Sequence, residues 1–257
     1  MAISSTDGSG GTTRPAVSLL FPEGQRPDAG RIHALAAAGG DFAVSFDPGA
    51  GPADTADRPG WLELLASGLT FDLVGLVPSD PAPVPSPRQT ISLGDNVDAR
   101  FEAITLQPGP HIAGASGILP IIRSLAWLGA VLSQLEGIEA VCWHPARCWS
   151  APNVYREAVL QWIEGGVFPG LILTSLHAMP DGGLQSEGLD VLTGQELRLE
   201  PDLAVDRATG AKLAVRLLDF LVVHGRVESA DRVVGPDGTP LRLEPSGNGQ
   251  FVRVWRG

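Results

Sequence analysis

Apolar and polar positions change their spacing repeatedly along the chain, so strand-like and helix-like blocks follow one another in short order. Apolar runs bounded by Pro, Gly or Asp are typical of strands, and such runs lie at residues 16–21, 41–46, 101–107 and 138–143. The runs WLELLA (61–66) and LTFDLVGL (69–76) are separated only by Ser67-Gly68, which predicts a β-hairpin. With a helix after its first strand, the first part of the chain reads strand, helix, strand, strand, strand.

Apolar residues that recur every three or four positions predict helices. The strongest such pattern covers residues 116–135, with Ile118, Ile121, Ile122, Leu125, Leu128, Leu132 and Leu135 on one face. A helix over 28–38 would end at Gly39-Gly40. Further helices are predicted over 150–164, with Ser150 as N-cap and Pro152 in the first turn, and over 206–224, with Asp206 as N-cap.

The rest of the second half reads as strands. We expect one strand at 168–179 and a second strand region at 186–201 with a bend at Gly194. The tail from residue 231 onwards predicts a β-meander, with its first turn at Pro236-Asp237-Gly238 and its second at 246–249.

This alternation predicts an α/β or, more narrowly, an α+β fold, in which helices pack on a mixed β-sheet. Consecutive strands after each strand-helix-strand start make the sheet mixed, not wholly parallel. The stretches SGLTFDLVGL and EGLDVLTGQEL resemble each other, which raises the alternative of two similar subdomains.

The division of the chain follows its composition. Residues 1–14 are predicted as a flexible N-terminus, 15–78 as a βαβββ subdomain and 101–257 as a C-terminal α/β domain. Between them, residues 79–100 are rich in proline, which cannot continue a helix or a sheet interior. Two interpretations stay open for this segment: a linker between two domains, or a loop that follows the surface of one.

Charge excludes some classes of partner. The net charge is −11, Lys212 is the single lysine, and no cluster of Lys and Arg occurs. Because phosphate neutralisation needs several clustered cations, we expect neither nucleic-acid binding nor adsorption to an anionic membrane. The most apolar run, 117–132, contains Pro120 and Arg123 and is too short for a bilayer span.

Several features predict a bacterial cytoplasmic protein. Two cysteines make no disulfide framework, and the first fifteen residues lack the basic and apolar regions of a secretory signal. The preference for Ala, Gly, Pro and Arg over Lys is typical of a GC-rich bacterial genome.

The stretch CWHPARCW (142–149) carries the most reactive residue types. Cys142, His144 and Cys148 could ligate a metal, with His111 or His177 as a fourth ligand. Zinc sites favour a closer cysteine pair than Cys-x5-Cys, however. In an extended strand Cys142 and His144 also share one face, while Trp143 points to the other. We therefore expect no metal and no cofactor.

Cys148 is the candidate nucleophile, because it directly precedes a predicted helix N-terminus and follows Arg147. Both features lower a thiol pKa. His144 is the nearest possible base, with His177 as a further candidate. The acidic residues Asp181, Glu187, Asp190 and Glu196 are interpreted as solvated turn residues.

Several familiar site motifs are missing or incomplete. No nucleophile-elbow, Walker or zinc-protease motif occurs in the chain. The GASG turn at 114–117 is interpreted as a helix entry and not as a phosphate site.

Residues 138–226 resemble a bacterial family known only as a domain of unknown function. The resemblance rests on a strand that ends at Trp143, on Pro169, on Gly188-Leu189 and on the Gly194–Leu197 step. These are packing and turn positions, so the resemblance implies no activity, cofactor or catalytic residue.

The sequence favours a non-enzymatic protein-binding or adaptor module, whose acidic surface would suit a basic patch on a partner protein. The alternative is a small hydrolase-like enzyme with a site near His144, Cys148 and His177. The two hypotheses differ in geometry: the enzyme requires His144, Cys148 and an acidic residue to meet in one pocket.

Overall fold

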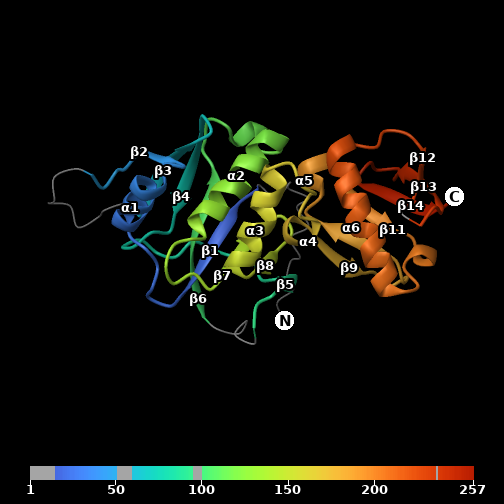
Figure 1. The fold of residues 1–257 in the computed structure, drawn as a ribbon, viewed down its shortest axis with the longest axis horizontal. Helices are drawn as coiled ribbons and strands as arrows, with labels where there is room; N and C mark the ends of the chain where they lie inside the picture. Colours follow the sequence, from blue (N-terminus) through green and yellow to red (C-terminus); the bar gives the residue numbers. More distant parts are fainter. Residues whose placement is uncertain (1–14, 51–59, 95–99, 236) are drawn as a thin grey trace, which may run out of the picture.

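The fold combines two mixed β-sheets with six α-helices, counted over the part of the chain that the structure describes. The computed structural model describes residues 15–50, 60–94, 100–235 and 237–257. The sheets lie side by side along the longest axis, the N-terminal one at the left of Figure 1 and the C-terminal one at the right. This architecture confirms the predicted α+β class.

The first sheet has eight strands in the order β2-β3-β4-β6-β1-β7-β8-β5. All neighbours are antiparallel except β5 and β8. The strands are β1 (Val17–Pro22), β2 (Ala43–Phe46), β3 (Trp61–Ala66), β4 (Leu69–Val74), β5 (Gln89–Ile91), β6 (Phe101–Pro108), β7 (Ala140–Trp143) and β8 (Cys148–Ser150). The predicted hairpin is β3–β4.

Strands from both sides of the proline-rich segment share this sheet. β1 lies between β6 and β7, and it is hydrogen-bonded to both. The segment itself contributes β5, which pairs with β8. The described part of residues 15–78 therefore forms no sheet of its own. Residues 79–94 of the predicted linker lie along the sheet instead of bridging two bodies, and 95–99 lie outside the described residues.

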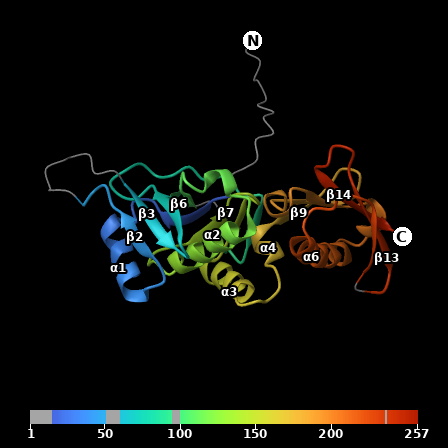
Figure 2. The same ribbon diagram turned by 90° about the horizontal axis from the view of Figure 1, so that it is seen from above.

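Helices cover one face of the first sheet. These are α1 (Ala29–Gly39), α2 (Leu119–Leu132) and α3 (Pro152–Ile163), which lie together on one side of the strands in Figure 2. Val17, Leu19 and Phe21 of β1 belong to the apolar core of this side. Ser18 lies between them in sequence and points to the other face, because side chains alternate along a strand.

The second sheet has six strands in the order β12-β13-β14-β11-β10-β9. They are β9 (Ser175–Ala178), β10 (Leu184–Glu187), β11 (Glu196–Leu199), β12 (Asp231–Val234), β13 (Pro240–Pro245) and β14 (Phe251–Arg256). The helix α6 (Arg207–His224) packs on it through Leu217 and Leu221, and begins at the predicted N-cap Asp206, whose carboxylate accepts from the Thr209 amide. The predicted meander is β12–β13–β14. Its second turn closes through the Gly249 amide and the Ser246 carbonyl, and Pro236 of the first turn lies outside the described residues.

Three local predictions were wrong. The strand expected at 168–179 starts as a helical turn, α4 (Gly170–Leu173), because Pro169 and Gly170 interrupt the extended chain. The region 186–201 folds into β10 and β11 with the single-turn helix α5 (Asp190–Thr193) between them, which ends at Gly194 with φ 75°. Ser150 belongs to β8, and Ala151 occupies the N-cap position of α3.

One continuous apolar core joins the two sheets. Residues of β1, β6 and α2 belong to the same cluster as residues of β11, β14 and α6. The short helix α4 contacts β8, β9 and α6, so it packs at the junction. The two sheets differ in strand number and order, and the two similar stretches fold differently, as β4 and as α5 with β11. The described residues therefore do not form a pair of similar subdomains.

Candidate ligand-binding site

The face of the first sheet that the helices leave open carries a pocket of about 1230 Å³. Residues of β4 and β6, the residues just before β1, and His144 just after β7 form its floor. Its walls come from residues 82–85, from the loop after β6, from the turn between β7 and β8, and from Glu187 of β10. Both sheets therefore contribute to one site.

The proline-rich segment forms one of these walls. The Ala82 amide donates to the Ala103 carbonyl (2.9 Å), and the Trp149 indole Nε1 donates to the Pro85 carbonyl (3.1 Å). Val84 and Leu93 pack on the small apolar cluster of Leu20, Ala103, Ala140, Cys142 and Trp149. Because proline rings fix the backbone, the segment supplies a stiff wall over a sheet face that would otherwise be open.

Three polar side chains lie in one row across the pocket floor. Asp72 of β4 is directly opposite Gln107 of β6. Continuing that register places Ala16 next, and the His144 amide donates to its carbonyl (3.0 Å). Strands lie about 4.8 Å apart, so roughly 14 Å separates the Asp72 and His144 positions. The Asp72 and Gln107 side chains make no hydrogen bond with any described residue.

A buried hydrogen-bond chain fixes the ring of His144. Its Nε2 lies 2.6 Å from Oγ of Ser18, which in turn lies 2.6 Å from Oγ1 of Thr105. Burial lowers the pKa of His144 to about 4, so the ring is neutral at pH 7. Its Nδ1 has no hydrogen-bond partner among the described residues and is the atom left for a ligand.

This Ser–His pair lacks the features of a catalytic one. Ser18 is fully buried and is not among the residues that line the pocket. A reactive serine needs an exposed hydroxyl and a base that is oriented by a third group. No carboxylate among the described residues hydrogen-bonds the His144 ring, so the arrangement positions the imidazole and does not activate Ser18.

Asp72 sits in an unfavourable electrostatic environment. Burial raises its pKa first, and Glu63 on the neighbouring strand raises it further, while His111 acts in the opposite direction. Glu63 is directly opposite Asp72 in the β3–β4 register. The Ser45 hydroxyl donates to Glu63 (2.7 Å), so Glu63 has a partner that Asp72 lacks.

An ion-pair cluster forms the wall of the pocket at the turn between β7 and β8 and at β10. Arg147 donates to Glu187 through Nε (2.6 Å) and through its second guanidinium nitrogen (3.1 Å), and Arg88 donates through Nε (3.1 Å). His177 Nε2 lies 3.8 Å from the same carboxylate. Burial favours the neutral acid, but the two arginines outweigh it and hold the pKa of Glu187 below its ordinary value.

The structure separates the residues that the sequence proposed as one catalytic site. Cys148 lies on the helix-covered face, where its thiol donates to the Leu171 carbonyl (3.4 Å), while His144 lies on the pocket face. Burial raises the pKa of Cys148 to about 12, so the predicted lowering was wrong. His177 meets Glu187 and not His144, and burial is the main cause that lowers its pKa.

The three proposed metal ligands are separated in the same way. Cys142 faces the pocket side next to Trp149, its partner on β8, and burial raises its pKa strongly. Cys148 faces the opposite side, as strand alternation and the Trp143–Cys148 pairing require. Among the described residues, no group of three or more His, Cys, Asp or Glu side chains is placed to hold a metal ion.

Sequence reasoning missed two of the three polar side chains on the pocket floor, those of Asp72 and Gln107. Asp72 is the polar position of the run FDLV, and polar Thr105 and Gln107 alternate with apolar residues in the run ITLQ; that alternation was the available signal. The proximity of Asp72 and Gln107 depends on the β4–β6 register, which the pattern of either strand alone does not specify.

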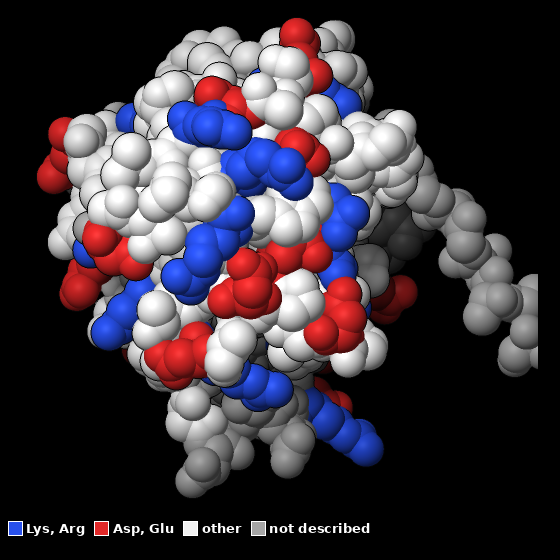
Figure 3. Space-filling view, turned by 90° about the vertical axis from the view of Figure 1, so that its right-hand side faces the viewer, with Lys and Arg blue, Asp and Glu red and all other residues white. Residues whose placement is uncertain are grey.

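The outer face of the second sheet is a second charged surface. Arg242 and Arg253 lie over the Trp255 ring, 5.0 and 4.8 Å from its centre. Glu244 and Glu200 pair with them at 3.1 and 2.7 Å, and Figure 3 shows arginines and acids intermingled at this end of the molecule. The arginines are thus neutralised within the chain.

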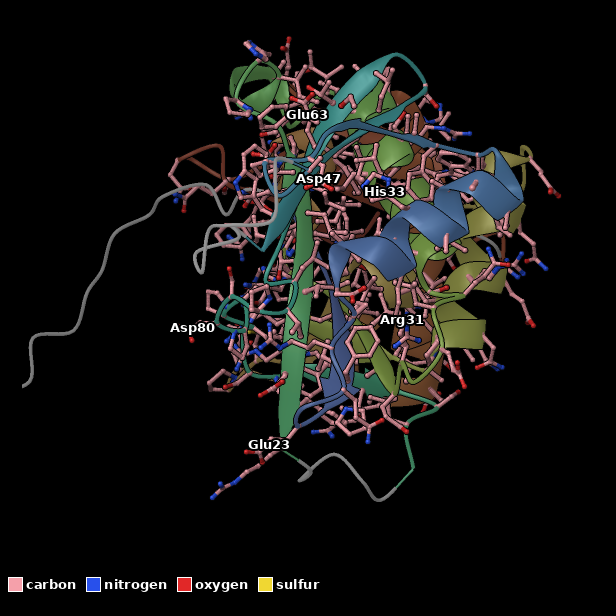
Figure 4. All side chains as sticks on the ribbon, turned by 90° about the vertical axis from the view of Figure 1, so that its left-hand side faces the viewer. Glu23, Arg31, His33, Asp47, Glu63 and Asp80 are labelled. Atoms are coloured by element: carbon pink, nitrogen blue, oxygen red, sulfur yellow. The ribbon has the colours of Figure 1, made fainter. Side chains whose placement is uncertain are left out.

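At the opposite end of the molecule, His33 of α1 pairs with Asp47 at 2.9 Å (Figure 4). The His33 side chain is 48% exposed, and surface pairs of this kind contribute little to stability. Among the described residues, this contact at the end of the molecule is a surface hydrogen bond.

Comparisons with protein-family models, with curated proteins and with solved structures found no match. The resemblance of residues 138–226 to a domain of unknown function therefore stays an expectation. Within the described residues, every helix is too short or too polar to cross a membrane.

Proposed function

We propose that the chain is a non-enzymatic binding module of the bacterial cytoplasm, which holds an extended segment of a partner protein in the pocket on the first sheet. The observation that carries this proposal is the pocket of about 1230 Å³, whose floor presents polar groups without partners among the described residues. Neither nucleic acid nor membrane is part of the proposal.

Size favours a peptide over a small metabolite. Small-molecule sites usually enclose about 300–1000 Å³ and are mostly apolar. This pocket is larger, and its floor carries Asp72, Gln107 and His144 in a row. An extended chain has backbone donors and acceptors at regular intervals, which matches such a row.

The chemistry favours binding over catalysis. A hydrolase would need an exposed nucleophile beside a base. Cys148 is on the other face with a raised pKa, and Ser18 is fully buried beneath His144. What the pocket offers is hydrogen bonding and charge.

The test is binding of a synthetic peptide library, with peptides of about twelve residues, which exceed the span of the floor when extended. Gln107→Trp places a large side chain on the pocket floor. Gln185→Trp makes the same change on β10, a strand whose Gln185 side chain does not line the pocket.

We expect the wild type and Gln185→Trp to bind the same peptides, and Gln107→Trp to lose them. If the wild type binds no peptide, the proposal is wrong. Peptides that bind equally well to both variants would place the binding surface elsewhere and would also contradict it.

A further inference from the structure

We propose, on the basis of that proposed function, that the bound segment carries a Lys or Arg side chain that pairs with Asp72, four or five residues away from a group that hydrogen-bonds His144. The pocket would then select basic segments. The inference rests on the charges that face the floor and on the spacing of its polar row.

Asp72 is a carboxylate without a counter-charge. It makes no ion pair with any described residue, and Glu63 is directly opposite on β3. Like charges directly opposite each other destabilise a sheet. A ligand cation would replace that repulsion with attraction, so binding of a cation is favoured here over binding of an anion or an apolar group.

The two arginines near the pocket already form ion pairs within the chain. Arg147 is bound through two nitrogens to Glu187, and Arg88 binds the same carboxylate. His111, on the loop after β6, is the one basic residue among the causes of the Asp72 pKa shift, and it makes no ion pair with Asp72. Neither arginine can pair with Asp72 without leaving Glu187, and His111 acts on it only at a distance, so a directly paired counter-charge has to come from the ligand.

The spacing of the row sets the length of the motif. About 14 Å separates the Asp72 and His144 strand positions, and an extended chain advances about 3.3 Å per residue. Four or five residues therefore span the row. Nδ1 of His144 is free among the described residues, while Nε2 is held by Ser18, so the ring offers one group in a fixed direction.

The amide-bearing Gln107 lies between the two ends of the row and opposite Asp72. An amide has both donors and an acceptor, so it can serve the backbone of any segment. Selectivity for a basic side chain therefore depends on Asp72. Gln107 and His144 help to fix the register in which the segment binds.

The experiment compares the peptide preferences of matched variants. The probe is the same library of synthetic peptides, followed by the tightest binder and its Lys→Gln or Arg→Gln counterpart. Asp72→Asn removes the charge and Asp72→Glu keeps it. Asp80→Asn removes the same charge from an exposed position outside the pocket lining (Figure 4).

We expect Lys or Arg to be enriched at one peptide position with the wild type, Asp72→Glu and Asp80→Asn. Asp72→Asn should lose the enrichment and bind the basic peptide roughly 10- to 150-fold more weakly, as expected for a charge-assisted hydrogen bond. It should fold, since it relieves repulsion with Glu63, and a thermal melt at least as high as that of the wild type would show this.

The outcomes separate the two proposals. If peptides bind and Gln107→Trp blocks them, but Asp72→Asn keeps the same preference, this inference is wrong and the proposed function stands. If no peptide binds the wild type, both fail. Butylamine, which carries the ammonium of Lys alone, should not displace the peptide at equal concentration. Displacement would mean that the site recognises a free amine and not a segment.

Discussion

Acidification should destabilise the protein because His144 takes up a proton more readily in the unfolded chain than in the folded chain. This effect should begin at a higher pH than the titration of most carboxylates. The pKa of this residue is about 4 in the folded chain, against an ordinary value of 6.5, because burial disfavours the charged ring. In the unfolded chain the ring takes up a proton as the pH falls below about 6.5, and the folded chain does so only near pH 4. The contribution of neutral His144 to the free energy of unfolding is therefore fully present above about pH 6.5 and is lost progressively as the pH falls from about 6.5 to about 4.

The size of the effect follows from the two pKa values. A shift of one unit corresponds to about 1.4 kcal/mol, so the full difference is about 3 kcal/mol. Most of it is already expressed at about pH 5, where linkage predicts a loss of about 2 kcal/mol relative to pH 7.5. Since whole domains are stable by about 5–15 kcal/mol, this loss is measurable.

Other groups titrate in the same window and have to be subtracted. Burial is the main cause that lowers the pKa of His177, which therefore acts in the same direction as His144. Burial raises the pKa of Glu196 to about 7, so its protonation acts in the opposite direction. Glu187, held below its ordinary pKa, loses stabilising charge only at lower pH.

The assay is urea unfolding followed by tryptophan fluorescence, at a series of pH values from about 7.5 to about 4.5. His144→Gln keeps a hydrogen-bonding group beside Ser18 but cannot titrate. The difference between the two proteins should shrink by about 2 kcal/mol between pH 7.5 and pH 5. His33→Gln, the same change at an exposed position, should follow the wild type. An equally steep decline in His144→Gln would refute the reasoning.

Three further predictions concern the junction and the thiols. Glu187→Gln should lower the free energy of unfolding by about 1 kcal/mol, because Arg147 and Arg88 lose their counter-charge. The control Glu244→Gln on the second sheet should lower it less. Equal losses of the two variants in denaturant melts would contradict this prediction. Gly188→Ala should destabilise the protein by roughly 1–3 kcal/mol or more, since φ is 94° and the new Cβ would lie 2.8 Å from the Ala146 nitrogen. The control Gly24→Ala, with φ 76° and open space around the new Cβ, should retain more stability. A smaller loss of stability in Gly188→Ala than in Gly24→Ala would disprove the close contact. Both thiols should resist iodoacetamide near pH 8 in the native protein and react after unfolding, because burial raises the pKa of both; rapid modification of native Cys148 would show that it is accessible.

Local periodicity predicted the elements that depend on neighbours in sequence. The hairpin β3–β4, the helices α1, α2 and α6 and the meander follow from alternation, capping residues and turn residues. The parity of Cys142 and His144 was predicted in the same way, since it needs only an extended strand. The short helices α4 and α5 were missed because each is a single turn, too short to show a period.

The sheet order could not be predicted, because it depends on contacts between residues far apart in the chain. Nothing in the run AVSLLF indicates that β1 lies between β6 and β7, or that Ser18 reaches Thr105 and His144. The role of residues 79–94 was open for the same reason. Their prolines exclude a helix but do not indicate which surface the segment covers.

The most direct test of the central claim is amide NMR of the wild type, titrated with the tightest peptide from the library. We predict that the largest shift changes will occur at the amides of residues 72, 107 and 144 and at those of Ala82 and Val84 in the wall, since Pro83 and Pro85 have no amide proton. Changes confined to the arginine-bearing face of the second sheet, around Arg242, Arg253 and Trp255, would contradict the account.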